Sequence, residues 1–553
     1  MVAILNTIRQ RLPAPRQDQE ARRARKERGR ESVEAGRRTY EPEGVNRLAQ
    51  DAPPWYRSAA RRRLYFLLLP GAVCSYATSG YDGSLLGTLQ TVGQWDNFFN
   101  NPRGAELGIM SAAMSLGSIF STPFAPWVAD HHGRRWGITV GSLIMIAGAI
   151  LQCQSVNLAM FIVSRFILGF GLSFATTAAP SLVTELSHPK DRVTITAICN
   201  TCWGLGSIVA AWITFGTRNI NNDWSWRLPS LFQMIPSIAQ LSAVWFLPES
   251  PRWLISKDRD NEALEALKRY HGDGEETELV KLEYEEIRAA IHMEKVTGAT
   301  TWKSMVSTPG NRYRMFLVMC MGFMSQWSGN GLISYYLARI MDSVGITDKD
   351  IQALVNGVLN IYTFALALTT AFFVERIGRR PLFRVSTLGM LTVFIAWTVA
   401  SARFQETKAS AAGIAVMVLI FVYCAFYNIA FAPLAVAYSV EILPFSIRAK
   451  GMATYIFSTK AAVFVNQFVN PIGLENIGWK YYIVYVAILA VECCIAYGWF
   501  VETKGKALEE IAVLFDGKNA SVGVDDGKQG EVVEVEEAEN RERKHCVTVV
   551  SKA

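Results

Sequence analysis

The sequence predicts an all-α membrane protein with twelve transmembrane helices in two pseudo-symmetric halves of six. Half of its 553 residues are apolar and only 19% are charged. Between Leu64 and Phe500 apolar stretches of about 20 residues follow one another, and each could cross the hydrocarbon core of a bilayer. Motifs of the first half also recur in the second. This pattern excludes a disordered chain, a fibrous repeat and a disulfide-stapled secreted module.

Hydropathy divides the chain into twelve predicted spans and the segments that flank them. The spans are 64–90, 105–128, 136–155, 159–182, 193–215, 228–247, 314–338, 350–374, 381–402, 411–440, 450–472 and 479–500. The expected domains are a basic tail (1–63), the first half (64–247), a linker with short amphipathic helices (248–313), the second half (314–500) and a mostly disordered tail (501–553).

The distribution of arginine and lysine predicts which side of the membrane faces the cytoplasm. The first tail is arginine-rich and lacks the apolar core of a cleavable signal peptide. Basic and nearly uncharged loops alternate, and lysine and arginine mark the cytoplasmic side. We therefore expect both termini and the linker to be cytoplasmic. The basic loops contain DHHGRR (130–135), HPKDR (188–192) and ERIGRR (375–380).

The sequence offers no site for enzyme chemistry, a metal or a cofactor. Cys199 and Cys202 form a C-x-x-C inside an apolar helical pattern, where two small packed side chains are the simpler interpretation. All six histidines fall outside the apolar stretches. A catalytic triad, a phosphate-binding loop and a dinucleotide fingerprint are all missing. We expect no catalytic residue, no metal and no cofactor.

An internal duplication relates the two halves. Asp130-x-x-Gly133-Arg134-Arg135 returns about 250 residues later as Glu375-x-x-Gly378-Arg379-Arg380. The pairs Glu185…Arg192 and Glu441…Arg448 share one spacing, and Glu249 in PESPRWL corresponds to Glu502 in VETKGKAL. Such a repeat implies a substrate site between two halves near the middle of the membrane, exposed to each side in turn.

The duplicated charges are candidates for a gate at the cytoplasmic face. An acid beside two arginines could hold neighbouring helix ends together, and the paired glutamates and arginines could complete the network. A topology signal would explain the arginines, but not the acids at matched spacing. The candidate gate residues are Asp130, Arg134, Arg135, Glu185, Arg192, Glu249, Arg252, Glu375, Arg379, Arg380, Glu441, Arg448 and Glu502.

These motifs resemble the sugar porter family of the major facilitator superfamily over roughly 64–510. The repeated DxxGRR, Arg165-x-x-x-Gly169-x-Gly171, PESPRWL and ETKGKALEE carry the resemblance together. The stretches SQWSGNGLISYY (325–336) and FVNPIGLENIGWKYY (468–482) resemble fungal lactose-permease-type sugar porters more narrowly. The resemblance implies that superfamily's fold and a plasma-membrane carrier of sugars, commonly coupled to a proton.

The resemblance also implies a coupling pair. The family's first-span acid is matched by Asp82 in Gly80-Tyr81-Asp82-Gly83, and its fourth-span arginine by Arg165. Intramembrane charges are costly, need partners and are commonly functional. Protonation of Asp82 would neutralise it, free Arg165 and change which conformation is stable. A purely structural ion pair is the alternative.

The sugar-binding positions depart from the family pattern. The fifth-span glutamine is Asn200, the first of two seventh-span glutamines is Ser325, and the tenth-span tryptophan is Val436. The smaller Ser325, Gly331 and Val436 would suit a larger sugar, and amides, hydroxyls and aromatic faces are what a sugar site needs. The candidate binding residues are Asn200, Ser325, Gln326, Asn330, Tyr335, Tyr336, Asn360, Tyr438, Asn466, Gln467 and Asn470.

The leading hypothesis is a monomeric secondary carrier that moves a sugar with protons. We expect a disaccharide such as lactose or cellobiose, or a hexose. The alternatives are a facilitator or exporter of another polyol-like or secondary metabolite and a sugar sensor that does not transport. The expected partners are the sugar, protons and the lipid bilayer, without nucleic acid.

Overall fold

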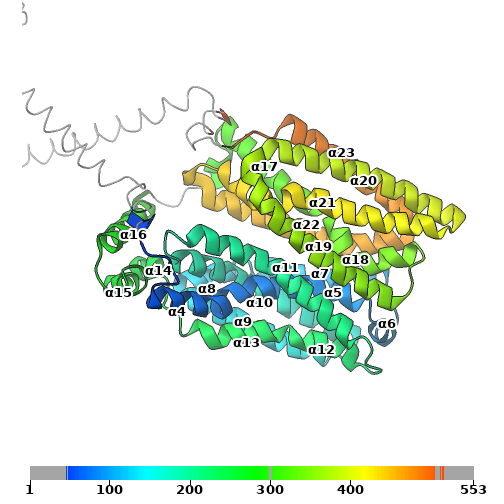
Figure 1. Ribbon diagram of the computed structural model, residues 1–553, viewed down its shortest axis with the longest axis horizontal. Helices are drawn as coiled ribbons and strands as arrows, with labels where there is room; N and C mark the ends of the chain where they lie inside the picture. The colour runs from blue at the N-terminus through cyan, green and yellow to red at the C-terminus, as the bar shows by residue number, and fades with distance from the viewer. Residues whose placement is uncertain are drawn as a thin grey trace, which may run out of the picture.

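Every regular element of the described residues is a helix. A computed structural model describes residues 52–297 and 302–504, together with 45, 48–50, 511 and 514–515. Its helices form two bundles that lie side by side, with three further helices at one end (Figure 1). The two terminal tails predicted from the sequence lie mostly outside the described residues.

The first bundle runs to the end of α13. It contains α4 (Ala59–Leu68), η1 (Leu69–Val73), α5 (Cys74–Leu89), α6 (Gly93–Phe98), α7 (Gly104–Ser121), α8 (Phe124–His131), α9 (Arg134–Cys153), α10 (Leu158–Leu186), α11 (Arg192–Thr217), α12 (Trp224–Phe232) and α13 (Met234–Val244). The linker holds α14 (Pro251–Ser256), α15 (Asp260–His271) and α16 (Glu278–Thr297).

The second bundle begins with a short 3₁₀ turn. It contains η2 (Trp302–Val306), α17 (Pro309–Trp327), α18 (Asn330–Ser343), α19 (Lys349–Ile377), α20 (Arg379–Thr407), α21 (Ser410–Glu441), α22 (Phe445–Ile477), η3 (Gly478–Lys480) and α23 (Tyr481–Gly498). Each bundle has a buried apolar core of its own.

The twelve predicted spans coincide with these helices, so the fold is that of a multi-pass membrane protein with two halves of six spans. Within the described part of the chain, seven helical stretches are by themselves long and apolar enough to cross a membrane, or eight if the pair α7 and α8, bent by 46°, counts as one. Other spans are broken. The seventh is divided at Gly329, where φ is 113° and the Phe394 ring leaves no room for a Cβ atom.

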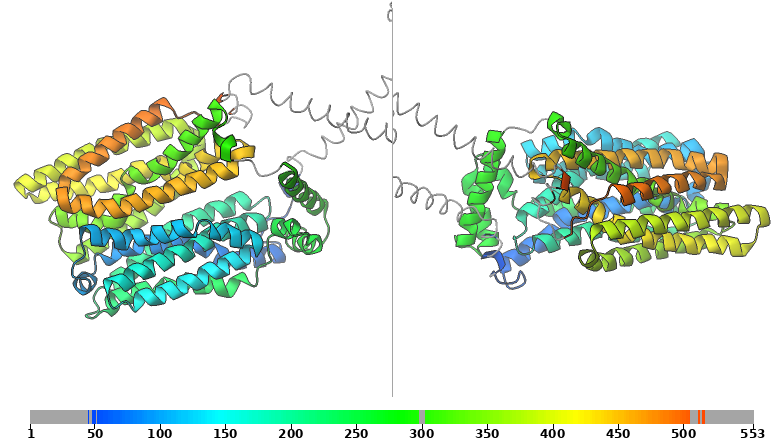
Figure 2. Two further views of the ribbon diagram at one scale, coloured as in Figure 1. Left: turned by 180° about the vertical axis from the view of Figure 1, so that it is seen from behind. Right: turned by 90° about the horizontal axis from the view of Figure 1, so that it is seen from above.

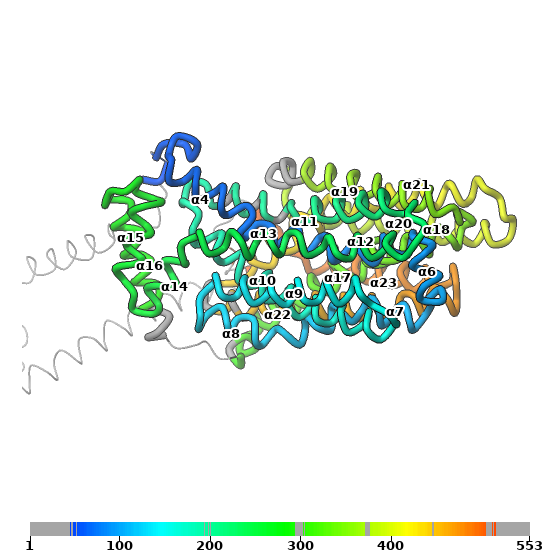
Figure 3. Tube along the Cα trace, turned by 90° about the horizontal axis from the view of Figure 1, so that it is seen from below, coloured from blue at the N-terminus to red at the C-terminus, as the bar shows by residue number. Residues whose placement is uncertain are grey.

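The two ends of the bundles differ. We call the end that carries α14–α16 the linker face and the opposite end, where α6 and the start of α19 lie, the distal face (Figures 2 and 3). At the seam between the bundles, α7 packs against α22 and α11 packs against α19. This seam is where the two halves meet within the membrane.

Small residues allow close helix packing inside the first bundle. Gly80 of α5 faces the Trp203 backbone and Gly206 of α11 faces the Ala77 backbone, with no room for a side chain at either glycine. Cys199 is buried in the same core, Cys202 packs against that core, and both are free thiols. This placement agrees with the packing interpretation of the C-x-x-C.

Candidate functional site

Ion pairs tie the two bundles together at the distal face. Asp96 on α6 accepts Arg339 of α18 at 2.9 Å and Lys349 of α19 at 3.1 Å. Arg218 at the end of α11 pairs with Asp350 of α19 at 2.6 Å. Among the side chains that the structure describes, every ion pair between the two bundles lies at this face. The described arrangement is therefore held shut on its distal side.

Hydrogen bonds continue the seam toward the middle of the bundles. Ser207 of α11 donates to Asn360 of α19 at 2.6 Å. Ser115 of α7 donates to Gln467 of α22 at 2.5 Å. The Gln90 amide donates to the Tyr335 carbonyl oxygen at 2.8 Å. Polar groups from both halves thus meet where a repeat of this kind places its substrate.

The break between α17 and α18 gathers several predicted binding residues. The Asn466 amide donates to the Gln326 carbonyl oxygen at 2.7 Å, and Tyr336 donates to the Gln467 carbonyl oxygen at 2.5 Å. A backbone break beside a polar seam is typical of substrate sites in carriers. The structure therefore brings these positions together, with Ser325 and Tyr335 on the same two helices.

Other predicted binding residues make their described hydrogen bonds within the second bundle. Asn470 is 1% exposed and accepts hydrogen bonds from Tyr481 at 2.9 Å and Tyr485 at 2.6 Å. Tyr336 is fully buried. The contacts of Asn470 are hydrogen bonds between helices, which stabilise helix packing in membranes.

Three predicted binding residues remain. One lies at the linker face, one accepts a hydrogen bond within its own helix, and the side chain of the third lies outside the described residues. Tyr438 lies one turn before the end of α21, where it donates to the Val501 carbonyl oxygen at 3.2 Å, so it belongs to the linker face. Asn330 opens α18 and accepts Ser334 at 3.3 Å. The side chain of Asn200 lies outside the described residues.

Asp82 and Arg165 are neighbours, but not as an ion pair. Both are at most 1% exposed, on α5 and α10. Arg165 donates from Nη1 to the backbone carbonyl oxygen of Asp82 at 3.3 Å. Neither carboxyl oxygen of Asp82 has a hydrogen-bond partner among the described groups. The carboxyl group is thus buried, beside a guanidinium, and unsatisfied.

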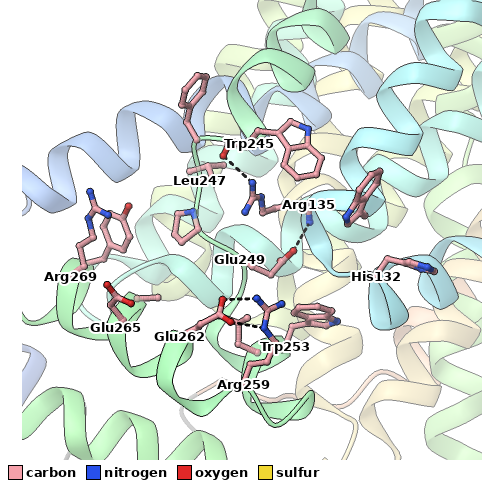
Figure 4. A pocket seen from close by; sticks show the side chains of 16 residues that line it. His132, Arg135, Trp245, Leu247, Glu249, Trp253, Arg259, Glu262, Glu265 and Arg269 are labelled. Carbon is pink, nitrogen blue, oxygen red and sulfur yellow. Dashed lines mark hydrogen bonds and ion pairs between the residues drawn. The ribbon is translucent and has the colours of Figure 1, made fainter.

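The first copy of the duplicated motif forms a compact cluster at the linker face. Glu249 accepts the backbone N–H groups of Arg134 at 3.1 Å and Arg135 at 3.3 Å. Figure 4 shows the contact with Arg135. Arg134 in turn pairs with Glu185 at 3.2 Å and Asp130 at 3.3 Å. The Glu249 carboxylate therefore caps α9, where the helix dipole favours a negative charge.

The second copy repeats this geometry. Glu502 accepts the backbone N–H groups of Arg379 at 2.9 Å and Arg380 at 3.0 Å, at the start of α20. Arg379 pairs with Glu441 at 2.9 Å, and Thr503 also donates to that glutamate. The equivalent acid, Glu375, has its side chain outside the described residues.

Glycine makes both caps possible. Gly133 and Gly378 immediately precede α9 and α20 with φ of 103° and 106°. At this φ the chain turns so that the next two N–H groups reach one carboxylate, and L side chains rarely adopt it. A Cβ atom at Gly133 would also clash with the capping Glu249, and one at Gly378 would make a tight contact with Glu502.

The two capping glutamates differ in environment. Burial raises the pKa of Glu249, and the N–H groups that it accepts only partly offset this. Burial also acts to raise the pKa of Glu502, but the backbone N–H groups of Lys504, Arg379 and Arg380 outweigh it, so the pKa lies below its ordinary value.

The remaining predicted gate residues are distributed around these clusters. Arg192 pairs with Glu283 of the linker at 3.4 Å rather than with Glu185. Arg448 donates to the Leu443 carbonyl oxygen at 3.3 Å, and Arg252 lies in α14. Among described side chains, the ion pairs of the motif residues stay within one bundle or join it to the linker.

A buried pair that the sequence analysis missed fastens the linker to the first bundle. His271 of α15 contacts Glu283 of α16 at 2.6 Å and the Leu186 carbonyl oxygen at the end of α10 at 3.2 Å. The ring of His188 lies 5.3 Å from that of His271. The amphipathic pattern of the linker gave no sign that two of its polar residues would be buried.

Sequence reasoning also missed the distal ion pairs and two charges inside apolar spans, Lys460 and Glu492. The signal for both charges was visible, since each interrupts a predicted span. The distal pairs had no comparable signal, because their residues belong to short loops and helix ends.

Comparisons with known proteins agree with this geometry. The family model "Sugar (and other) transporter" matches residues 67–515. The MFS-type transporter criB of Aspergillus cristatus is 28% identical over 79% of this chain and 90% of its own length. The MFS glucose transporter mfs1 of Aspergillus flavus is 27% identical over 82% of this chain and 90% of its own.

A solved structure has the same fold. The inward open conformation of the xylose transporter XylE from E. coli aligns with a TM-score of 0.68 and 19% identity, over 82% of this chain and all of that one. The family match covers most of the chain, including both bundles and the linker. The chain therefore belongs to the sugar porter family of the major facilitator superfamily, and it is a membrane transporter rather than an enzyme.

Proposed function

We propose that this transporter is a proton-coupled carrier that imports a sugar across the plasma membrane by alternating access, with the linker face and both termini in the cytoplasm. The observation that carries the proposal is the polar seam between the bundles, tied at its distal end and flanked by the buried Asp82 and Arg165. The basic loops at the linker face support the orientation.

Alternating access follows from where the ties lie. The pairs of Asp96 with Arg339 and Lys349 keep the distal side closed while the halves are free to separate at the linker face. In the opposite state these ties break, and the duplicated clusters at the linker face come together as the inner gate. Rocking of one half on the other links the two states.

Asp82 is the proposed proton carrier. An ionised carboxylate with no donor at its oxygens would cost several kcal/mol in this buried site, so we infer that Asp82 holds its proton in this state. Loss of the proton toward the cytoplasm would leave an anion beside Arg165. That pairing would favour the state in which Asp82 is open to the distal side and can be protonated again.

The substrate is proposed to be a disaccharide or a hexose held at the seam. Gln467, Asn360 and Gln326 supply the amide groups of this site. Ser325 is smaller than the glutamine of the family pattern, and this difference supports including a disaccharide.

Uptake in a cell without sugar carriers tests the proposal. Labelled lactose, cellobiose, glucose and galactose would be followed with and without a protonophore. Accumulation that collapses with the protonophore supports symport. Equilibration of the sugar that is unchanged by the protonophore would refute proton coupling. Absence of uptake together with a sugar-dependent transcriptional response would favour a sensor.

A further inference from the structure

Lys460 lies near the middle of a membrane-spanning helix. It is the sixteenth of 33 residues in α22, about 22 Å of helix rise from the start at Phe445 and about 26 Å from the end at Ile477. A lysine side chain spans only about 6 Å, so this ammonium group cannot reach a membrane surface along the helix. An ammonium at this depth needs an anion or water around it.

The helical period places Lys460 on the face of α22 that meets the first bundle. Gln467 lies seven residues later, hence two turns away on nearly the same line, and it accepts Ser115 of α7. Phe464, one turn after Lys460, lines an apolar groove with residues of α7 and α10. The opposite face of α22 packs against α17, where Asn466 and Ser458 make their contacts.

Lys460 has no anionic partner among the side chains that the structure describes. Among the described side chains, it takes part in no ion pair and no hydrogen bond. The buried Glu492 is on α23, which packs against α20 inside the second bundle. Asp82 is on the first bundle, and its carboxyl oxygens have no partner. A cation held at this depth without a counter-ion is suited to an anion supplied by the solute.

We propose that Lys460 binds a carboxylate of the transported solute, so the substrate class is an acidic sugar such as a uronic acid or an aldonic acid of a disaccharide. The amides of the seam bind its hydroxyl groups, and the ammonium group binds its acid. This inference rests on the proposed carriage of sugars at the seam and narrows it to a charged member of that class.

Paired probes of similar shape test this inference. Uptake of labelled lactose and lactobionate, and of glucose and glucuronate, would be compared in cells expressing the full chain. We expect the wild type to prefer at least one acid over its neutral partner by about 10-fold. Lys460→Gln should lower uptake of that acid about 10- to 100-fold, the range of a hydrogen bond to a charged group, and change uptake of the neutral sugar less than about 2-fold.

Two variants separate charge from structure. Lys460→Arg keeps the charge and should restore at least half of the acid uptake. Lys480→Gln removes an exposed lysine farther along the same segment and should change nothing. Equal losses for acid and neutral sugar in Lys460→Gln, or none for either, would overturn the inference.

The wild-type pattern separates this inference from the proposed function. Uptake of a neutral sugar without uptake of its acid would refute the role of Lys460 and leave sugar carriage standing. Uptake of none of the four probes, with the protein present in the membrane, would refute the proposed sugar carrier and this inference with it.

Discussion

At the distal face some ion pairs cross from one bundle to the other, whereas at the linker face the ion pairs between described side chains stay within one bundle or join it to the linker. Asp96 belongs to the first half, whereas its partners Arg339 and Lys349 belong to the second. Arg134 with Glu185, and Arg379 with Glu441, each belong to one half. The contrast teaches that the duplicated motif contacts the helix ends of its own half, while single, unrepeated charges connect the two halves at the distal face.

Breaking a linker-face cluster should have the largest effect. Glu441→Ala removes the partner of Arg379 and leaves a partly buried guanidinium unpaired. We expect uptake to fall at least about 10-fold while the amount of protein in the membrane changes less than 2-fold. Arg403→Ala, in an exposed pair with Glu406, is the control, and full activity of Glu441→Ala would contradict the proposed inner gate.

Removing the proposed proton site should lower accumulation about as much as breaking the cluster lowers uptake, but it should leave exchange of sugar across the membrane in place. Asp82→Asn keeps the shape of the side chain but cannot exchange a proton, so accumulation driven by a pH gradient should disappear. Equilibrative exchange of labelled for unlabelled sugar should persist at a measurable rate. Glu406→Gln, an exposed acid, serves as control. Retention of pH-driven accumulation by Asp82→Asn would show that coupling runs through another group.

Loosening the distal face should shift the population of states by a smaller factor. Asp96→Asn deprives Arg339 and Lys349 of their shared carboxylate, whose side chain is only 11% exposed. We expect a cysteine placed at Asn360 to react about 5-fold faster with a membrane-impermeant thiol reagent added on the distal side. An unchanged rate, measured in the same cysteine background, would mean that these pairs do not hold the face closed.

The docking of the linker should depend on pH. Burial lowers the pKa of His271, but the Glu283 carboxylate raises it more, so its stabilising contribution is full below about pH 6.5 and is lost at higher pH. Burial, with nearby His271 and Arg61, lowers the pKa of His188 to about 3, so its contribution is present above about pH 6.5 and falls at lower pH. Docking should therefore be tightest near pH 6.5.

Hydrogen exchange of α15 and α16 between pH 5 and pH 8, corrected for the intrinsic rate, would measure this. Burial acts to raise the pKa of Glu283, but His271 and Arg192 lower it overall, so its contribution is kept over this whole range and is lost only below about pH 4. His271→Gln should abolish the weakening on the alkaline side. A protection that is flat with pH in the unaltered chain would contradict the assignment.

The smallest effect on distal labelling is expected from the most exposed ion pair between the bundles. Asp350, the partner of Arg218, is 65% exposed, and such surface pairs contribute little. Arg218→Gln should therefore change distal labelling of the same cysteine by less than about 2-fold. A change as large as that of Asp96→Asn would mean that total charge at the face, rather than burial of one pair, controls closure.

Much of the fold could be predicted from the sequence because a helix that crosses the membrane needs about 20 consecutive, mostly apolar residues. The twelve spans and the repeat were visible in this way. Breaks at Gly329 and at η1 were not, since they depend on what the neighbouring helices leave room for.

The site was only partly predictable. Glu249 and Glu502 were singled out by the repeat, but their contact with backbone N–H groups depends on the φ of Gly133 and Gly378, which no residue pattern specifies. The Asp82 carboxyl was expected to face Arg165, yet the guanidinium reaches the backbone instead. Tyr438 has the chemistry of a sugar contact but lies at the wrong depth.

The glutamate-capped glycine turns also bear on engineering. A designer who wishes to change the solute should keep Gly133, Gly378 and their two glutamates unchanged, because L side chains rarely adopt the φ of either glycine and a methyl group would crowd its glutamate. Asn360 and Gln467 at the seam are helical positions without a positive φ. Libraries aimed at new substrates should therefore vary the seam and leave both turns untouched.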